Sequence, residues 1–214
     1  MPASTETIPP KTPTPGGAPR TPSPVFVKAK VCLVGEGSVG KTSLARRFVL
    51  DQFDDRYLPT MGAKVTKKEV VLSPDDTRVV LTVWDIMGEP TLRELLKEGY
   101  FRGCHGVMAV GDLTRPDTIA ALVDWVASVR RVAGHVPANV LANKADLASS
   151  PGAARELRDF VRLLPGRTWR TSAKTGANVE AAFMDIAREI ARAAMVQRGA
   201  DPPRREHRLE VEGT

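Results

Sequence analysis

The sequence predicts an α/β fold in which a mostly parallel sheet of six strands is covered by helices on both faces. Three observations support this. The length of 214 residues fits one domain with tails, and 42% hydrophobic with 26% charged residues is typical of a globular protein. Apolar, β-branched segments alternate with segments of helical periodicity, as in a parallel sheet. Two of the strands are joined only by a short turn, Ser73-Pro74-Asp75-Asp76, which makes one edge strand antiparallel.

The elements follow from these patterns in chain order. The strand segments are rich in β-branched residues and are predicted at 25–34, 63–72, 78–84, 105–110 and 168–171, and residues 140–142 are predicted to be the tail of a further strand. The helical segments carry apolar residues on one stripe and are predicted at 40–50, 117–132, 153–164 and 178–195. Ligands bind such sheets at the carboxyl ends of the strands, so functional motifs are expected in the loops that follow strands.

Both ends of the chain are predicted to lie outside this domain, which spans 25–196. Residues 1–24 contain eight of the 17 prolines, together with many Thr and Ser. Such a segment buries too little apolar surface to offset its ordering entropy, so it is predicted to be a disordered extension. Residues 197–214 are polar and charged and are predicted to form a flexible tail.

Composition and charge exclude several classes of protein. The two cysteines, Cys32 and Cys104, are too few for a disulfide framework and are predicted to be buried thiols of a cytoplasmic protein. No stretch approaches the ~18 to 20 apolar residues of a membrane span, and there is no secretory signal. The net charge of +6 is scattered over the body of the chain without interleaved aromatic residues. A solvated basic surface is therefore favoured over a nucleic-acid site.

The loop after the first strand matches the phosphate-binding pattern G-x-x-x-x-G-K-[ST], between a strand and a helix as that pattern requires. Its glycines allow backbone N–H groups to turn toward phosphates, and the helix N-terminus adds a positive dipole. Lys41 can span the terminal phosphates, and the Thr42 hydroxyl can ligate Mg²⁺. The alternative is a Gly-rich turn with no binding role, which the position between a strand and a helix disfavours. The predicted residues are Gly35, Glu36, Gly37, Ser38, Val39, Gly40, Lys41, Thr42 and Ser43.

Asn143-Lys144-Ala145-Asp146 follows a later strand and predicts which base is bound. A carboxylate accepts two hydrogen bonds, which matches the adjacent N1–H and 2-amino donors of guanine. Adenine has an acceptor at N1 and no 2-amino group, so it would leave a desolvated carboxylate unpaired. The stem of Lys144 can lie along the base or the ribose. A guanine nucleotide is therefore expected, with a plain polar loop as the disfavoured alternative.

With these motifs in place, the chain resembles the Ras superfamily of small GTPases, and its Rab-like branch most of all. The resemblance covers about residues 25–195. Its motifs occur in family order and are GEGSVGKT, YLPT at 57–60, WDIMG at 84–88, NKAD and TSAK at 171–174, with YFRGCHG at 100–106 especially Rab-like. The resemblance implies the P-loop NTPase fold of the family, with six strands and five helices, and a nucleotide-controlled switch.

The resemblance also implies roles where residues match. Thr60 looks like the threonine that ligates Mg²⁺ and senses the γ-phosphate, and an ordinary turn threonine is the alternative. Asp85 looks like the acid that holds Mg²⁺ through water, and Gly88 like the glycine whose N–H meets the γ-phosphate. Phe53 stands where the family places an aromatic edge against guanine, with a core Phe as the alternative. The loop residues Ser172, Ala173 and Lys174 look like the segment that meets guanine O6.

Two features depart from the family pattern. Glu89 stands where the water-orienting glutamine is expected, and Pro90 follows it in place of an acid. No cysteine follows Cys104, so the usual prenyl anchor is not expected. Glu89 can accept a hydrogen bond from the attacking water but cannot donate one to the γ-phosphate, and it adds a negative charge beside that phosphate. Its basicity has the opposite effect, because a better base favours the attack of water. Pro90 restricts the backbone of Glu89, which can either pre-position the Glu89 side chain for catalysis or hold it away from the phosphate.

The first reading is a cytoplasmic, monomeric guanine-nucleotide switch that binds Mg²⁺ with GTP or GDP and hydrolyses GTP slowly without a partner. Lys41, Thr60, Gly88 and Glu89 are its predicted catalytic residues. Effectors, exchange factors and GTPase-activating proteins are expected to bind through the loops around Thr60 and Gly88. The alternative, motivated by Glu89, is a GTP-binding scaffold with negligible turnover. A basic nucleic-acid binder is the third and least favoured reading.

Overall fold

The computed structural model describes residues 25–54, 60–74, 76–89, 98–163, 166–197 and 199. The predicted extension 1–24 lies outside these residues, and so does nearly all of the predicted tail. The last helix ends at Gln197, two residues beyond the helix end that periodicity predicts.

Six strands form one mixed sheet in the order β2-β3-β1-β4-β5-β6, which confirms the predicted fold class. Only the β2–β3 pair is antiparallel, with Ala63 opposite Ile86 and Leu72 opposite Thr77. The remaining neighbours are parallel. The strands are β1 (Phe26–Val34), β2 (Ala63–Leu72), β3 (Thr77–Ile86), β4 (Gly106–Asp112), β5 (Ala138–Asn143) and β6 (Arg167–Arg170).

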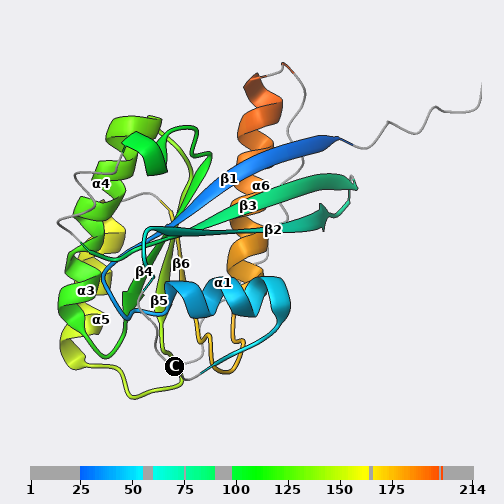
Figure 1. Cartoon of the computed structure of the whole chain (residues 1–214). Coiled ribbons are helices and arrows are strands. Elements are labelled where there is room, and N and C mark those ends of the chain that lie inside the picture. Colours follow the sequence, from blue (N-terminus) through cyan, green and yellow to red (C-terminus); the bar gives the residue numbers. More distant parts are fainter. Residues whose placement is uncertain are drawn as a thin grey trace, which may run out of the picture.

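Helices lie on both faces of this sheet (Figure 1). The described helices are α1 (Lys41–Leu50), α3 (Pro116–Ala120), α4 (Leu122–Ala133), α5 (Pro151–Leu163) and α6 (Val179–Gln197). Helices α1 and α6 cover one face, and α3, α4 and α5 lie on the other. None of the described helices is long and apolar enough to cross a bilayer.

The single helix predicted over 117–132 is wrong in one respect, because α3 and α4 are separate elements. Ala121 lies between them with φ −64° and ψ −15°. The Ala121 N–H still donates to the Asp117 carbonyl at 3.0 Å, and the Trp125 N–H donates to the Ala121 carbonyl at 3.2 Å. The helical hydrogen bonds therefore continue across the junction, which is why apolar periodicity does not register the interruption.

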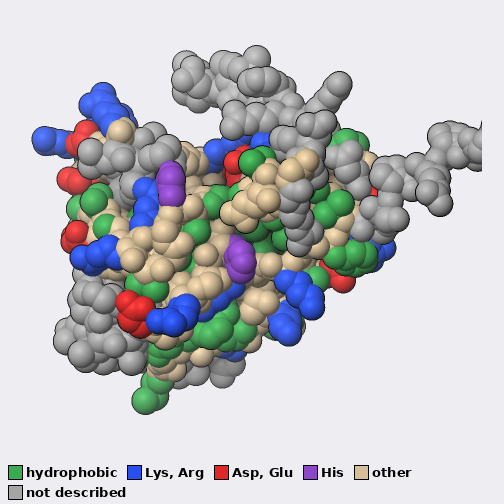
Figure 2. All heavy atoms as spheres, turned by 90° about the horizontal axis from the view of Figure 1, so that it is seen from above, with side chains coloured by type: hydrophobic (Ala, Val, Ile, Leu, Met, Phe, Trp, Pro, Cys, Tyr) green, Lys and Arg blue, Asp and Glu red, His purple; other side chains and the backbone are tan. Residues whose placement is uncertain are grey.

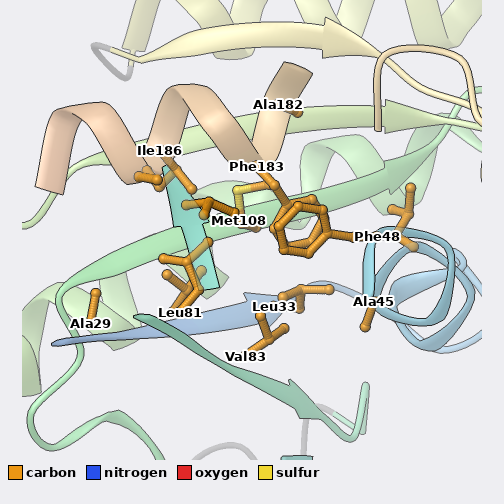
Figure 3. Close-up of a cluster of buried hydrophobic side chains, with 14 of the residues drawn as sticks. Ala29, Leu33, Ala45, Phe48, Leu81, Val83, Met108, Ala182, Phe183 and Ile186 are labelled. Carbon is orange, nitrogen blue, oxygen red and sulfur yellow. The ribbon is translucent and has the colours of Figure 1, made fainter. Parts of the chain in front are cut away.

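The larger core lies between the sheet and helices α1 and α6 (Figure 3). The rings of Phe48 in α1 and Phe183 in α6 are stacked at its centre, with centroids 4.0 Å apart and an angle of 4° between their planes. This contact holds the first helix, which begins at the phosphate-binding pattern, against the last helix. The core thereby fixes the position of α1 relative to the ends of the strands.

We expect Phe183→Ala to lower the free energy of unfolding by about 3–5 kcal/mol, because it leaves a cavity in a packed core. Phe183 is fully buried. The matched control is Phe26→Ala, since Phe26 is 59% exposed; a change within about 0.5 kcal/mol is expected there. Urea unfolding of both variants measures the difference. Equal losses in the two variants would contradict the assignment of Phe183 to the core.

The second core lies between the sheet and α4. Trp125, Val126 and Val129, which share the predicted apolar stripe of α4, are all buried there. Cys32 and Cys104 belong to the same core and are buried, free thiols, as the sequence predicts. Both faces of the sheet are thus covered, and the carboxyl ends of the parallel strands remain the edge at which loops can form a site.

Candidate nucleotide-binding site

A cavity of about 750 Å³ opens at the carboxyl ends of the parallel strands. It is formed by the loops that follow β1, β3, β5 and β6, together with the start of α1. The sequence-predicted residues that line it are Gly37, Ser38, Gly40, Lys41, Thr42, Ser43, Phe53, Thr60, Gly88, Glu89, Asn143, Lys144, Asp146, Ala173 and Lys174. Its volume lies within the range of small-molecule sites.

Five predicted residues do not line the cavity but lie behind its wall: Gly35, Glu36, Val39, Asp85 and Ser172. The Val39 carbonyl accepts from the Asn143 amide at 2.8 Å. The Ser172 hydroxyl donates to Asp146 at 2.6 Å. These residues therefore position their neighbours, and Asn143 ties the loop after β5 to the loop after β1.

The loop after β1 has the backbone that its glycines allow. Gly40 has φ +99°, and a side chain there would collide with the Asn143 amide. Ser38 also has a positive φ, 63°, which is uncommon for a residue with a side chain. The loop ends where α1 begins at Lys41. Such a succession of N–H groups at a helix N-terminus suits an anion.

The ammonium of Lys41 turns back over this loop. Nζ donates to the carbonyl oxygens of Gly35 at 2.8 Å and Glu36 at 2.7 Å. Burial lowers the pKa of Lys41 to about 8, and the charges of Asp85 and Glu36 offset only part of that effect. A buried ammonium with a lowered pKa gains stability when an anion arrives beside it.

Three oxygen-bearing side chains meet at the cavity wall, where Thr42 and Thr60 line the cavity and Asp85 lies behind them. The Thr42 hydroxyl donates to Asp85 at 2.5 Å and lies 3.0 Å from the Thr60 hydroxyl. The other carboxylate oxygen of Asp85 is buried and has no hydrogen-bond partner within the part of the chain that the structure describes. Burial raises the pKa of Asp85 above its ordinary value, and the Thr42 hydrogen bond and Lys41 oppose that rise. A cation at this point would relieve the unpaired oxygen.

This donor set fits Mg²⁺, which prefers oxygen ligands and is held by one or two carboxylates plus substrate phosphates. Thr42, Thr60 and Asp85 are the residues that would hold it. Among the described residues, no cluster of three or more His, Cys, Asp or Glu forms a complete metal cage. The fit therefore depends on phosphate oxygens that the nucleotide would supply.

Gly88 packs against the phosphate-binding loop more closely than any side chain permits. A Cβ at Gly88 would lie 2.5 Å from the Glu36 carbonyl carbon and 2.5 Å from Lys41 Nζ. Glu89 follows directly, is exposed and lines the cavity. The residue in place of the family's glutamine thus lies at the cavity wall, while Pro90 falls outside the described residues.

The opposite side of the cavity carries the predicted base-binding residues. Asp146 lines the wall and accepts from Ser172. The Lys144 ammonium pairs with Asp112 at 2.6 Å, which leaves the aliphatic stem of Lys144 along the wall. Phe53 lines the cavity and also packs against the larger core, so both sequence interpretations of Phe53 describe part of its environment.

Sequence reasoning missed several residues that position this site. Arg47 in α1 donates to the carbonyl oxygens of Ala173 at 2.9 Å and Lys174 at 2.7 Å. Trp125, which the sequence assigns to packing, is fully buried and also donates from its indole N–H to Glu36 at 2.9 Å. Asp112, the last residue of β4, and Arg115, in the loop that follows, were also missed. For Asp112 and Arg115, the only indication in the sequence was that polar residues stand where an apolar strand ends.

Basic residues do not gather into one patch on the face of the molecule in Figure 2. Among the side chains that the figure colours, Lys and Arg are dispersed among acidic, apolar and other groups. This agrees with the scattered distribution of the net charge of +6 along the sequence.

The fold and the cavity define a nucleotide-binding α/β protein with a phosphate-binding loop. The sequence model of the Ras family matches residues 30–192. The chain therefore belongs to the Ras family of small GTPases, whose members are guanine-nucleotide switches that hydrolyse GTP.

Curated relatives indicate the Rab-like branch. Ras-related protein Rab-22A of Canis lupus familiaris is 33% identical over 179 residues, covering 81% of this chain and 87% of the relative. Rab-22A of Homo sapiens is 33% identical over 166 residues, covering 75% and 82%. Ras-related protein Rab-21 of Bos taurus is 30% identical over 173 residues, covering 80% and 77%.

Proposed function

We propose that this chain is a Rab-like switch that binds Mg²⁺ with GTP or GDP in the cavity described above and hydrolyses GTP slowly in the absence of a partner. The observation that carries the proposal is the convergence of four separate motifs on one cavity wall. Residues more than a hundred positions apart, such as Val39 and Asn143, are joined there by a direct hydrogen bond.

On the phosphate side, the N–H groups of the loop after β1 and the Lys41 ammonium bind the phosphates. Lys41 gives up its carbonyl partners for phosphate oxygens, which are stronger acceptors. Thr42, Thr60 and Asp85 hold Mg²⁺, which neutralises charge on the phosphates when bound. The N–H of Gly88 meets the terminal phosphate, because only a glycine approaches the loop this closely.

On the base side, Asp146 accepts from the two adjacent donors of guanine, and Ser172 holds the carboxylate in place. Ala173 and Lys174 bound the cavity at the same end, and Phe53 contributes an aromatic edge. Lys144 lays its stem along the base or ribose, because its ammonium is fixed at Asp112.

Thr60 and Gly88 connect the nucleotide to partners. Thr60 directly follows the segment 55–59, and Gly88 is separated by Glu89 alone from the segment 90–97; both segments lie outside the described residues. GTP contacts both residues, and hydrolysis releases them, so the adjacent loops change with the nucleotide. Effectors, exchange factors and GTPase-activating proteins bind through these loops.

The test is to identify the nucleotide that co-purifies with the full chain and then to follow single-turnover hydrolysis of GTP. Bound GDP or GTP and a slow, Mg²⁺-dependent release of phosphate support the proposal. Bound guanine nucleotide with no turnover above the uncatalysed rate would favour the scaffold, which the Glu89 position motivates. Absence of guanine-nucleotide binding at micromolar concentrations would overturn both.

The lowered pKa of Lys41 leads to a further expectation, namely that GDP binding takes up protons at pH 8.5. The nucleotide-free side chain is largely neutral there, because its pKa is about 8. Phosphates stabilise the ammonium form, so its pKa rises in the complex and a proton is bound. Calorimetric titration in two buffers of different ionisation enthalpy measures the uptake, which shrinks toward pH 7. A heat of binding that is independent of buffer at pH 8.5 would contradict this role of Lys41.

A further inference from the structure

Arg115 lies behind the phosphate-binding loop and hydrogen-bonds its backbone. Nη2 donates to the Gly37 carbonyl at 2.7 Å, across 78 positions in the sequence. Arg115 is not among the described residues that line the cavity. Its contact with the loop is therefore made from outside the site.

This contact fixes the orientation of one peptide group. In a trans peptide the C=O and the N–H point in opposite directions. The Gly37 carbonyl is turned toward Arg115, so the N–H of the same peptide, which belongs to Ser38, points away from Arg115. Ser38 lines the cavity, and within the described residues its N–H has no backbone acceptor. That donor is thus available to an anion in the cavity.

The backbone of Ser38 is strained, so neighbouring contacts such as the hydrogen bond from Arg115 are needed to hold it. Its φ of 63° is in the left-handed region, which is unfavourable for residues with a side chain. Strained backbone persists where surrounding contacts hold it. The charged hydrogen bond from Arg115 to the preceding carbonyl is one such contact.

Arg115 is itself held by contacts of both its backbone and its side chain. Its carbonyl accepts from the Thr118 hydroxyl at 2.6 Å, and its N–H donates to the Asp112 carbonyl at 2.9 Å. Its side-chain Nε lies 3.4 Å from the Asp112 carboxylate, of which only 1% is exposed. A guanidinium with two fixed partners can hold a backbone carbonyl in a single direction.

Asp112 extends this arrangement to the base side of the cavity. The same carboxylate oxygen that Arg115 approaches also pairs with Lys144 at 2.6 Å. Burial alone would raise the pKa of Asp112, but the hydrogen bonds from Lys144 and Thr114 outweigh burial and keep it below its ordinary value. Asp112 therefore stays charged at neutral pH, and one buried anion fixes a cation on each side of the site.

We propose that Arg115 is a positioning residue for phosphate binding: it holds the Gly37–Ser38 peptide by its carbonyl, so that the Ser38 N–H faces the phosphates, and Asp112 holds Arg115 and Lys144 together. The inference rests on the proposed function, since it assumes that the loop binds nucleotide phosphates. It adds a residue from the loop after β4, which none of the predicted motifs includes.

The expected result is that Arg115→Ala releases GDP about tenfold faster than the unaltered protein, the loss typical of one charge-assisted hydrogen bond. Arg115→Lys restores part of the retention, because a lysine can donate to the carbonyl but cannot also keep the planar fork toward Asp112. Arg155→Ala is the matched control, since Arg155 is an exposed arginine of α5 whose recorded ion pair is with Asp159. It is expected to release GDP at the unaltered rate.

The experiment combines three measurements on the full chain: release of fluorescently labelled GDP, the ³¹P resonances of bound GDP, and thermal unfolding of the nucleotide-free protein. The proposal is supported if Arg115→Ala speeds release and shifts a ³¹P resonance while the unfolding temperature without nucleotide is unchanged. It is overturned if release and resonances match the unaltered protein, or if release rises only together with a lower unfolding temperature and unmoved resonances. Failure of the unaltered protein to bind GDP would instead refute the proposed function.

Discussion

Asp146→Asn is expected to lower the affinity for GDP and GTP by roughly 10³-fold and to shift the preference toward xanthine nucleotides. Asp146 lines the cavity next to Asn143 and Lys144, and its position is fixed by the 2.6 Å hydrogen bond from Ser172. The replacement keeps the size of the side chain and removes its charge. Packing is therefore preserved, and the effect reports recognition of the base.

The physical reason is the match of donors and acceptors. In the proposed complex, the carboxylate of Asp146 accepts from both N1–H and the 2-amino group of guanine, whereas asparagine offers one acceptor and one donor. Its amide N–H would face the 2-amino group, so donor meets donor. Xanthine carries a carbonyl at C2, which accepts from that amide. A mismatch in a desolvated site leaves polar groups unpaired, which is why the expected loss is large.

Competition of GDP, XDP and ADP for the nucleotide-free protein measures this preference. The unaltered protein is expected to favour GDP over ADP by at least ~10³-fold. Asp159→Asn is a control for the same chemical change, because Asp159 lies on the exposed face of α5 and pairs with Arg155 and Arg162. If Asp146→Asn binds GTP as tightly as the unaltered protein, the assignment of Asp146 to the base is wrong.

The strands were predicted well where their apolar pattern is continuous, and less well where a polar residue is buried. The β2 segment has the predicted bounds, whereas for β5 (Ala138–Asn143) the sequence predicted only the tail of the strand, at 140–142, and not where the strand begins. Asn139 looks like a loop residue in the sequence, but its amide donates to Ala182 and Asp185, both at 3.1 Å. Those partners lie more than forty positions away, so no local pattern announces them.

The residues of the candidate site also fall into those that the sequence predicts and those that it does not. Motif residues such as Lys41 and Asp146 were identifiable because nucleotide chemistry demands particular side chains at fixed spacing. Arg47 and Arg115 were not, because the site groups that they hold are backbone carbonyl oxygens, which any residue could supply. Residues that contact a ligand leave a sequence signal, and residues that position those contacts act through distances that only the folded chain defines.

The last expected result concerns catalysis. Glu89→Gln is expected to hydrolyse GTP faster than the unaltered protein, by about 10²-fold, the effect of one well-placed polar group in such a site. Glu89 lines the cavity immediately after Gly88, and Gly88 touches the phosphate-binding loop. The side chain therefore lies beside the place that the proposed function assigns to the γ-phosphate.

Two effects oppose each other at this position. Ionised Glu89 accepts a hydrogen bond from water but has no donor for the phosphate, and it places a negative charge beside a transferring group that is already anionic. Against this, a carboxylate is a better base than an amide. The transition state of phosphoryl transfer is stabilised mainly by positioning and charge, so repulsion and the missing donor outweigh basicity. A partner that supplies a cation, such as an arginine, would offset the repulsion and provide the missing hydrogen-bond donor.

Single-turnover hydrolysis at saturating Mg²⁺ decides between these effects. The control is Glu98→Gln, which removes the same charge at an exposed glutamate whose recorded partner is Arg102 and which is not among the described residues lining the cavity. Its rate should equal that of the unaltered protein. A slower Glu89→Gln would mean that Glu89 is a useful base, and an unchanged rate would mean that this side chain does not take part in hydrolysis. Only acceleration confined to Glu89→Gln agrees with a long-lived GTP state set by the charge at this position.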